Sequence, residues 1–374
     1  MFNRTLTPIL KQKMGKGKAI LLIGPRQVGK TTLIKMLLEK ESFLFLDGDD
    51  PTVRNLLTNP NTAQIKSIIG QYKIIFIDEA QRIAGIGLTM KIITDQFKEV
   101  QLIVSGSSSF ELNNAISEPL TGRKWEFELF PISWQELELH EGFLSSKQQL
   151  NNRLLYGLYP DVLNHPGEEI AILKNLVNSY LYRDILSYSN IRKPEVLEKL
   201  VQALALQIGN EVNYTEIAQL IGVDKNTVNS YINILQQGYV IFKLKSFSRN
   251  LRNEIKKNNK IYFYDVGVRN MIIGNFSSLD LRDDKGAIWE NFLIAERIKQ
   301  NTYNSKITNT FFWRTKQQQE IDFIEEANGE LNAYEFKWNA KSGTKISDTF
   351  MKAYKASAHI IDRTNFREFV MTDF

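Results

Sequence analysis

The strongest constraint on the fold of this chain is a glycine-rich motif near its N-terminus. Residues 24–31 read GPRQVGKT and match the pattern G-x-x-x-x-G-K-[ST] at every fixed position. The apolar run at residues 18–23 precedes the motif, and apolar residues at helical spacing follow it. A strand, a glycine loop and a helix in this order form the context in which such a motif holds phosphate. The sequence therefore predicts a nucleotide-binding α/β unit, against the alternative of a chance glycine turn before a helix.

The residue types of the motif suit the chemistry of a bound triphosphate. Gly24 and Gly29 let the backbone turn tightly and direct N–H groups at the β-phosphate. Lys30 is expected to reach the β- and γ-phosphate oxygens as a catalytic cation, and the Thr31 hydroxyl is expected to ligate Mg²⁺. ATP and Mg²⁺ are therefore the predicted cofactors. The predicted phosphate-binding set is Gly24, Pro25, Arg26, Gln27, Val28, Gly29, Lys30, Thr31 and Thr32.

A second apolar run ends in a pair of acidic residues. Residues 73–77 (KIIFI) are followed directly by Asp78 and Glu79. We expect Asp78 to hold Mg²⁺ through its water shell and Glu79 to polarise the attacking water. An acidic pair after a strand is a weak signal alone, but it is strong when it follows a phosphate-binding motif within the same unit.

Two further positions are candidates for contact with the γ-phosphate. Ser105 and Ser107 follow a third apolar strand, where either could sense the phosphate or simply belong to a serine-rich loop or cap. Arg123 precedes the strand expected at residues 125–129. It could supply positive charge to the transferred phosphoryl group, within the chain or to a neighbouring subunit, or it could form an ordinary surface ion pair.

Several segments together resemble one family. The runs GPRQVGKTTL, FIDEAQR, SGSSSFEL and GRKWEFELFPISWQEL resemble the bacterial and archaeal AAA-family ATPases that carry a domain of unknown function called DUF4143. The resemblance extends through YGLYP at residues 156–160 and SYLYRD at residues 179–184, and it covers nearly the whole chain. It implies an AAA-type nucleotide switch, a winged helix and a restriction-endonuclease-like C-terminal domain.

Composition narrows the chemistry and the partners. The 374 residues contain no cysteine and three histidines without metal-ligand spacing, so a bound metal would be a hard cation held by oxygen. The apolar run at 19–23 is too short for a signal peptide, and no apolar stretch of about eighteen residues occurs. A cytoplasmic protein without a membrane span is therefore expected. The formal charge of +5 favours a polyanionic partner.

Residues 213–248 have the pattern of a DNA-binding module. A capped helix from Asn213 ends at Gly222, and Asp224 begins a second helix whose outer face is rich in amide and hydroxyl groups, which suits a major groove. A β-extension after Gly238 completes a predicted winged helix-turn-helix. A basic run follows, which could contact phosphates; its members are Lys243, Lys245, Arg249, Arg252, Lys256, Lys257 and Lys260. The alternatives are a protein-docking module and a solvated charged loop.

The C-terminal segment contains a second group of carboxylates. Strand alternation places Glu335 and Lys337 on one face, and a hairpin around residues 328–329 would bring Asp322 opposite them. With Glu290 on a preceding helix, these residues resemble the PD-(D/E)xK nuclease core, although Ile321 stands where that pattern has proline. The resemblance implies that Glu290, Asp322 and Glu335 hold Mg²⁺ and that Lys337 stabilises charge. The alternative is a two-stranded ribbon whose charges face water.

These observations give one preferred interpretation. The expected fold is α/β, with a P-loop AAA-type ATPase core and parallel sheet at 1–135, a helical lid at 136–195, a winged helix-turn-helix at 196–250 and an α/β nuclease-like domain at 251–374. The expected function is ATP hydrolysis coupled to action on nucleic acid, with DNA favoured over RNA. The alternatives are a nucleotide-controlled binding switch with an inactive nuclease-like domain, and a scaffold in which ATP promotes homo-oligomer formation.

Overall fold

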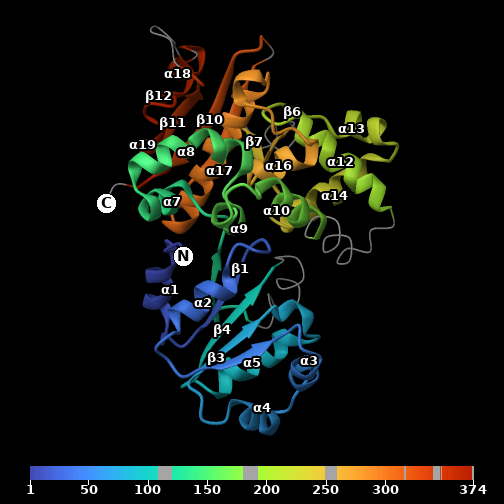
Figure 1. Cartoon of the computed structure of the whole chain (residues 1–374), viewed down its shortest axis with the longest axis vertical. Coiled ribbons are helices and arrows are strands. Elements are labelled where there is room, and N and C mark those ends of the chain that lie inside the picture. The colour runs from blue at the N-terminus through green and yellow to red at the C-terminus, as the bar shows by residue number, and fades with distance from the viewer. Residues whose placement is uncertain are drawn as a thin grey trace. The chain divides into compact units, whose positions relative to one another are not determined.

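The computed structural model describes two units, each with its own sheet (Figure 1). The first unit comprises Met1–Ile132 with Gln237–Tyr239, and the second comprises Ser133–Gln236 and Val240–Phe374. The described residues are 1–107, 120–179, 193–248, 259–315, 317–339, 346 and 348–372. The tyrosine-rich segment at 180–184 and the basic residues Arg249, Arg252, Lys256 and Lys257 lie outside them.

The first unit is built on a parallel sheet, as the sequence predicts, and this sheet has five strands. Its order is β2-β3-β4-β1-β5, with bounds Leu44–Asp47, Ile74–Asp78, Gln101–Gly106, Ala19–Ile23 and Lys124–Glu128. Every residue of β1 is at most 1% exposed, and each fully buried leucine or isoleucine there contributes roughly 1.5–3 kcal/mol. Because β4 lies between β1 and β3, the carboxyl ends of these three strands meet at one edge of the sheet.

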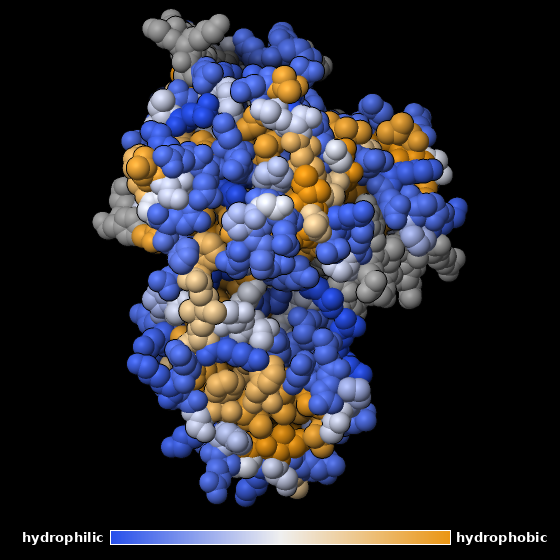
Figure 2. Space-filling model, in the orientation of Figure 1, coloured by the Kyte–Doolittle hydropathy of each residue, from blue (hydrophilic) through white to orange (hydrophobic). Residues whose placement is uncertain are grey.

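Short helices connect the strands of this sheet. They are α1 (Leu6–Lys13), α2 (Lys30–Leu37), α3 (Pro51–Leu57), α4 (Thr62–Ile69), the 3₁₀ turn η1 (Ala80–Arg82) and α5 (Ile86–Gln96). Local sequence fixes several of their ends: Asn61 and Gln64 form a capping box at α4, and the Asp50 side chain caps α3. Figure 2 shows apolar residues gathering on this unit over α4 and α5.

The second unit contains a seven-stranded mixed sheet of order β12-β11-β10-β9-β7-β8-β6. The bounds in that order are Ser357–Ile361, Glu330–Phe336, Glu320–Ala327, Asn309–Arg314, Ile241–Ser246, Asn259–Phe263 and Glu211–Val212. The β10–β11 hairpin turns at Asn328 (φ 52°) and Gly329 (φ 82°), where the sequence places it. The sheet therefore brings Asp322 next to the strand that ends before Lys337.

Helices surround this sheet, and the longest of them is α17 (Lys285–Tyr303). The other helices of the described residues are α7 (Trp134–Glu141), α8 (Phe143–Tyr156), α9 (Pro160–Asn164), α10 (Glu169–Leu176), α12 (Pro194–Leu206), α13 (Tyr214–Ile221), α14 (Lys225–Gln237), α16 (Val266–Ile273), α18 (Asp348–Tyr354) and α19 (Phe366–Val370), with the 3₁₀ turn η3 (Leu279–Leu281). Figure 1 shows α12, α13 and α14 gathered beside β6. No helix of the described residues is long and apolar enough to cross a membrane.

The two helices predicted in this region are present as α13 and α14, with the predicted residues at their ends. The Asn213 side chain accepts the N–H groups of Thr215 and Glu216, Gly222 ends α13 at φ 73°, and Asp224 accepts from the next helix. β7 pairs with β8 on one side and with β9 on the other. The strand pair that follows α14 is therefore continuous with the sheet that carries Asp322, across the predicted boundary at residue 250.

Candidate functional site

The glycine loop between β1 and α2 has the backbone geometry that its sequence predicts. Gly29 is left-handed at φ 91° and N-caps α2, and Gln27 also has a positive φ of 61°. Gly24 (φ 148°) is required for a further reason: a Cβ placed on it would lie 2.0 Å from the carbonyl oxygen of Leu129, just past β5. The close approach of the adjacent strand, as well as the turn, therefore demands glycine at position 24.

Lys30 is buried at the start of α2 and lies across the loop. Its ammonium donates to the carbonyl oxygens of Gly24 and Pro25, each at 2.8 Å. Burial lowers the pKa of Lys30 to about 8, although the carboxylates of Glu79 and Asp78 oppose that shift. A buried ammonium whose hydrogen bonds in the described structure go to carbonyl oxygens would gain from direct contact with an anionic oxygen, which a nucleotide phosphate would provide.

The Asp78 carboxylate ends β3 and receives two hydroxyl groups. Thr31 Oγ1 donates to Asp78 Oδ2 at 2.6 Å, and the buried Ser105 hydroxyl at the end of β4 donates to Asp78 Oδ1. These three oxygen-bearing side chains come from α2, β3 and β4. A hydroxyl and a carboxylate side by side are oxygen donors of the kind that Mg²⁺ prefers.

Glu79 adopts an unusual backbone conformation next to Asp78. Its φ of 46° is left-handed, which is rare for a residue with a side chain and is common at functional sites. Its Oε2 accepts from Gln81 Nε2 at 2.6 Å and from Ser107 Oγ at 3.2 Å, and Gln81 also donates to Ser107 at 2.8 Å. Gln81 was not identified as a site residue from the sequence. The feature of the sequence that could have indicated it is its position two residues after Glu79.

In the second unit, the carboxylates expected near the hairpin do lie together. Asp322 Oδ2 accepts the backbone N–H of Phe336 at 2.8 Å, and Lys337 Nζ pairs with Glu335 Oε1 at 2.6 Å. Burial, together with the charges of Glu290 and Glu335, raises the pKa of Asp322 well above its usual value. The side chains named from the D…E-x-K spacing thus share one environment.

Glu290 has partners that the sequence did not indicate. Its Oε1 accepts from Tyr262 Oη at 2.5 Å and from Lys260 Nζ at 3.1 Å, and Lys260 also pairs with Glu320 at 2.6 Å. Lys260 is 1% exposed, and although burial disfavours its charge, these carboxylates raise its pKa above the ordinary value. The assignment of Lys260 to a solvent-facing phosphate-binding run is therefore wrong, because β8 directs it into the carboxylate group.

The residues present offer a partial fit to a metal ion. Glu335 Oε2 is buried and has no hydrogen-bond partner among the described atoms. Asp322 lies beside it in a cluster of excess negative charge. However, no three histidine, aspartate or glutamate side chains of the described ranges are arranged to hold a metal. Glu290 is engaged by Lys260 and Tyr262, and Glu335 Oε1 by Lys337, so Asp322 and Glu335 Oε2 are the oxygens of the described cluster best placed to bind a cation.

Three models of known families match successive parts of the chain. Residues 16–138 match the family model described as an AAA domain, and residues 285–371 match that of a domain of unknown function, DUF4143. The chain pairs an AAA-type P-loop domain with a DUF4143 domain. A further domain of unknown function, DUF8612, matches residues 147–279, between the two.

Similar proteins support this arrangement without adding an activity. An uncharacterized protein of Mycobacterium tuberculosis is 28% identical over 88% of this chain and 72% of its own length. An uncharacterized protein of Methanocaldococcus jannaschii is 24% identical over 83% of this chain and 73% of its own length. Among solved structures, a Walker-type ATPase of Pyrococcus abyssi superposes with a TM-score of 0.51 at 16% identity, covering 73% of this chain and 96% of that one. This likeness shows the fold.

One predicted catalytic residue of the AAA domain lies at the wrong edge of the sheet. β5 runs parallel to β1 and pairs Lys124 with Ala19, so Arg123 adjoins the beginning of β1, whereas the P-loop follows its end. Five strand residues separate these edges by roughly 16 Å. Arg123 instead pairs with Asp95 at 2.5 Å on the surface. It therefore does not reach the phosphates of its own chain, and action on a neighbouring subunit stays a prediction.

Proposed function

We propose that the AAA domain hydrolyses ATP in a Mg²⁺-dependent reaction and that this nucleotide cycle controls the DUF4143-containing unit. Lys30 would bind the β- and γ-phosphate oxygens, and Thr31 with Asp78 would hold the metal. Mg²⁺ bound there neutralises charge on the phosphates during transfer. Glu79 would orient and polarise the attacking water. The observation that carries the proposal is the 2.6 Å contact between Thr31 Oγ1 and Asp78 Oδ2 beside the buried Lys30.

Phosphate release from Mg·ATP tests the proposed hydrolysis. We expect the wild type to release phosphate and Lys30→Ala to lose both nucleotide binding and turnover. Lys35→Ala is the matched control, because Lys35 is exposed on the same helix. Loss of activity in Lys35→Ala to the same degree, or unchanged turnover in Lys30→Ala, would contradict the assignment.

The second unit is proposed to act on nucleic acid, with DNA favoured. The exposed face of α14 carries Lys225, Asn226, Asn229, Ser230 and Asn233. Such amide and hydroxyl groups can bond base edges or phosphates, as in a winged helix-turn-helix. Asp322 and Glu335 would hold Mg²⁺ beside a phosphodiester, and Lys337 would stabilise the charge that develops on it. ATP binding would then set the arrangement in which DNA meets this site.

A second candidate is a binding switch that cuts nothing. The observation that favours it is Lys260, whose ammonium neutralises Glu290 and Glu320 from within the chain. Cleavage of supercoiled plasmid with Mg²⁺ or Mn²⁺, with and without ATP, separates the two candidates. Nicking that disappears in Asp322→Ala supports the nuclease, and its further loss in Lys30→Ala supports control by ATP. Hydrolysis of ATP without any nicking supports the switch.

Assembly into a homo-oligomer is the remaining proposal for the AAA domain. Arg123 is half-exposed in its pair with Asp95, so a neighbouring subunit could recruit it. Mass photometry with and without ATP tests this directly. A chain that stays monomeric in both conditions would remove the scaffold interpretation while leaving hydrolysis unaffected.

A further inference from the structure

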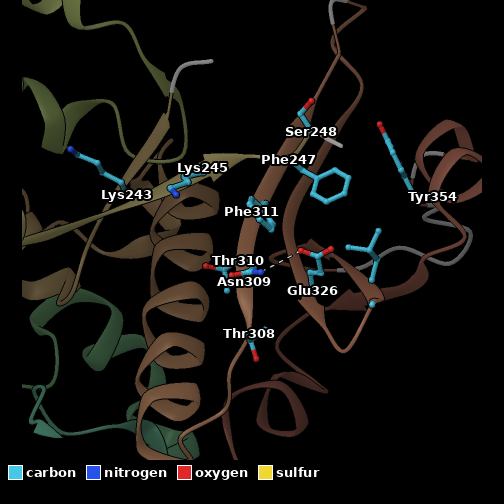
Figure 3. Close-up of a pocket in the computed structure, with 12 residues that line it drawn as sticks. Lys243, Lys245, Phe247, Ser248, Thr308, Asn309, Thr310, Phe311, Glu326 and Tyr354 are labelled. Atoms are coloured by element: carbon cyan, nitrogen blue, oxygen red, sulfur yellow. Dashed lines mark hydrogen bonds between the residues drawn. The ribbon is translucent and has the colours of Figure 1, made fainter. Parts of the chain in front are cut away.

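A groove of about 650 Å³ lies in the second unit, apart from the carboxylate cluster (Figure 3). Its walls come from β7, the start of β9, the β10–β11 hairpin and α18. The polar side chains that line it include Lys243, Lys245, Thr308, Asn309, Thr310 and Glu326. A volume of this size is typical of ligand sites, and its lining is rich in hydrogen-bond donors.

The charge in the groove favours an anionic ligand. Lys243 and Lys245 are two residues apart on β7, so their side chains leave the same face of the strand about 7 Å apart. Glu326 is the acidic residue of the lining, and Asn309 Nδ2 donates to it at 3.4 Å (Figure 3). The lining therefore carries two lysines and one carboxylate that already has an amide partner, and the hydroxyls of Thr308 and Thr310 add donors to it.

The groove is connected to the exposed face of α14. Lys243 Nζ donates to Asn233 Oδ1 at 2.6 Å, and Asn233 belongs to the amide-rich face of that helix. A linear ligand that lies along α14 would meet Lys243 where the helix face ends and Lys245 one step further into the groove. Because the α14 face and the groove adjoin, they suit a long, chain-like anion better than a single small anion.

The floor of the groove is aromatic. Phe247 contacts Phe311 edge-on at 5.4 Å and Tyr354 at 5.1 Å between ring centroids. Phe247 and Phe311 are buried, whereas the Tyr354 ring is partly exposed at the groove wall. A partly exposed tyrosine ring across the groove from two lysines (Figure 3) suits an unpaired base in a strand whose phosphates contact those lysines.

We propose that this groove binds a nucleic-acid single strand that continues from α14, with Lys243 and Lys245 on its phosphates and Tyr354 against a base. The inference rests on the proposed action of the second unit on nucleic acid and adds the place where an unpaired strand lies. An acidic peptide shares the charge of such a strand but offers neither bases nor phosphates, so competition separates the two.

Fluorescence anisotropy of a fluorescein-labelled thymidine homopolymer, measured over a series of KCl concentrations, tests the groove. The affinity falls with salt, so the slope of log affinity against log salt is negative. We expect Lys245→Ala to reduce the magnitude of this slope by about 0.7, and Lys243→Ala/Lys245→Ala to reduce it by about 1.4. Lys174→Ala is the matched control, because Lys174 is an exposed lysine on α10 of the same unit. Melting temperatures show whether each variant is folded. If the double variant is unstable, the single variant Lys245→Ala is used for the test, because Lys245 is exposed.

The remaining arms separate failure of the groove from failure of the proposed function. Lys225→Ala on α14 is expected to weaken binding in its own right. If Lys225→Ala weakens binding while the groove variants match Lys174→Ala, the groove proposal is overturned and nucleic-acid binding stands. If the wild type binds no oligonucleotide at any salt concentration, both fall. If polyglutamate displaces the strand as well as unlabelled oligonucleotide does, the groove is a site for acidic peptide and the proposal is overturned.

Discussion

The carboxylates of the P-loop site and those of the DUF4143 cluster have different kinds of partner. Asp78 and Glu79 are bonded to neutral groups, the hydroxyls of Thr31, Ser105 and Ser107 and the amide of Gln81. Glu290, Glu320 and Glu335 are instead paired with the lysines at positions 260 and 337.

This difference indicates that the P-loop site can accept a cation more readily than the DUF4143 cluster can. Neutral donors can turn toward a metal ion or its water shell without leaving a charge unpaired, whereas a paired ammonium must be displaced at the cost of its own desolvated charge. The number of carboxylates is therefore a poorer guide to metal binding than the kind of partner each one has.

Removing the internal cation of the second site should cost the most stability. Lys260→Met leaves Glu290 and Glu320 without their buried partner, and breaking such a pair costs about 3 kcal/mol here, since Glu320 is partly exposed. Chemical denaturation measures the loss, with Lys225→Met on the exposed face of α14 as control. Lys260→Met should also bind Mn²⁺ more tightly than wild type does, which isothermal titration calorimetry would measure. Unchanged stability would show that Lys260 does not neutralise the cluster.

Two glycines of the P-loop should respond unequally to the same substitution. Gly24→Ala drives a Cβ into the Leu129 carbonyl, whereas Gly29→Ala meets nothing within 4 Å and suffers only from its positive φ. We expect Gly29→Ala to cost about 1 kcal/mol and Gly24→Ala roughly 2 kcal/mol more. Denaturation midpoints of the two variants provide the comparison. Equal losses would contradict the role assigned to the approach of Leu129.

Neutralising Asp322 should stabilise the second unit at neutral pH. The pKa of Asp322 is raised in the folded state, so the folded chain binds this proton more tightly than the unfolded chain does. The protonated Asp322 therefore contributes fully to the free energy of unfolding below its ordinary pKa, and this contribution is lost as the pH rises through the raised pKa. Asp322→Asn keeps an acceptor for the Phe336 N–H and removes this loss. Its melting temperature should exceed that of wild type at pH 7, and the gain should shrink near pH 4. A lower melting temperature at pH 7 would contradict the account.

The smallest effect is expected at Arg123. Its exposed ion pair with Asp95 contributes less than about 1 kcal/mol, so Arg123→Ala should leave the melting temperature nearly unchanged. Phosphate release per chain should also stay at the wild-type level under dilute, monomeric conditions. A large loss of turnover in a confirmed monomer would mean that Arg123 does reach its own phosphates.

The sequence predicted contiguous features well and charge partners poorly. The P-loop, the acidic pair at the end of β3, the caps of α13 and the hairpin at Asn328 each depend on neighbouring residues, and all are present. The approach of Leu129 to Gly24 depends on how β5 joins the sheet, which no local pattern encodes.

The remaining errors have the same physical origin. Lys260 looked like one cation of a basic run because its neighbours in the sequence are basic. Its burial follows from β8 pairing with β6 and β7 under α17, a long-range arrangement. Arg123 was a candidate because it precedes a strand of the nucleotide-binding unit. Only the parallel pairing of β5 with β1 reveals that it precedes the distant end.

The most direct test of the central claim compares Mg·ATP turnover in wild type and Glu79→Gln. The substitution keeps the shape of the side chain but removes the carboxylate proposed to polarise water. We predict that phosphate release falls by about 100-fold or more while binding of a fluorescent ATP analogue is retained. Turnover within a few-fold of wild type, with binding intact, would contradict the assignment of this site as the centre of ATP hydrolysis.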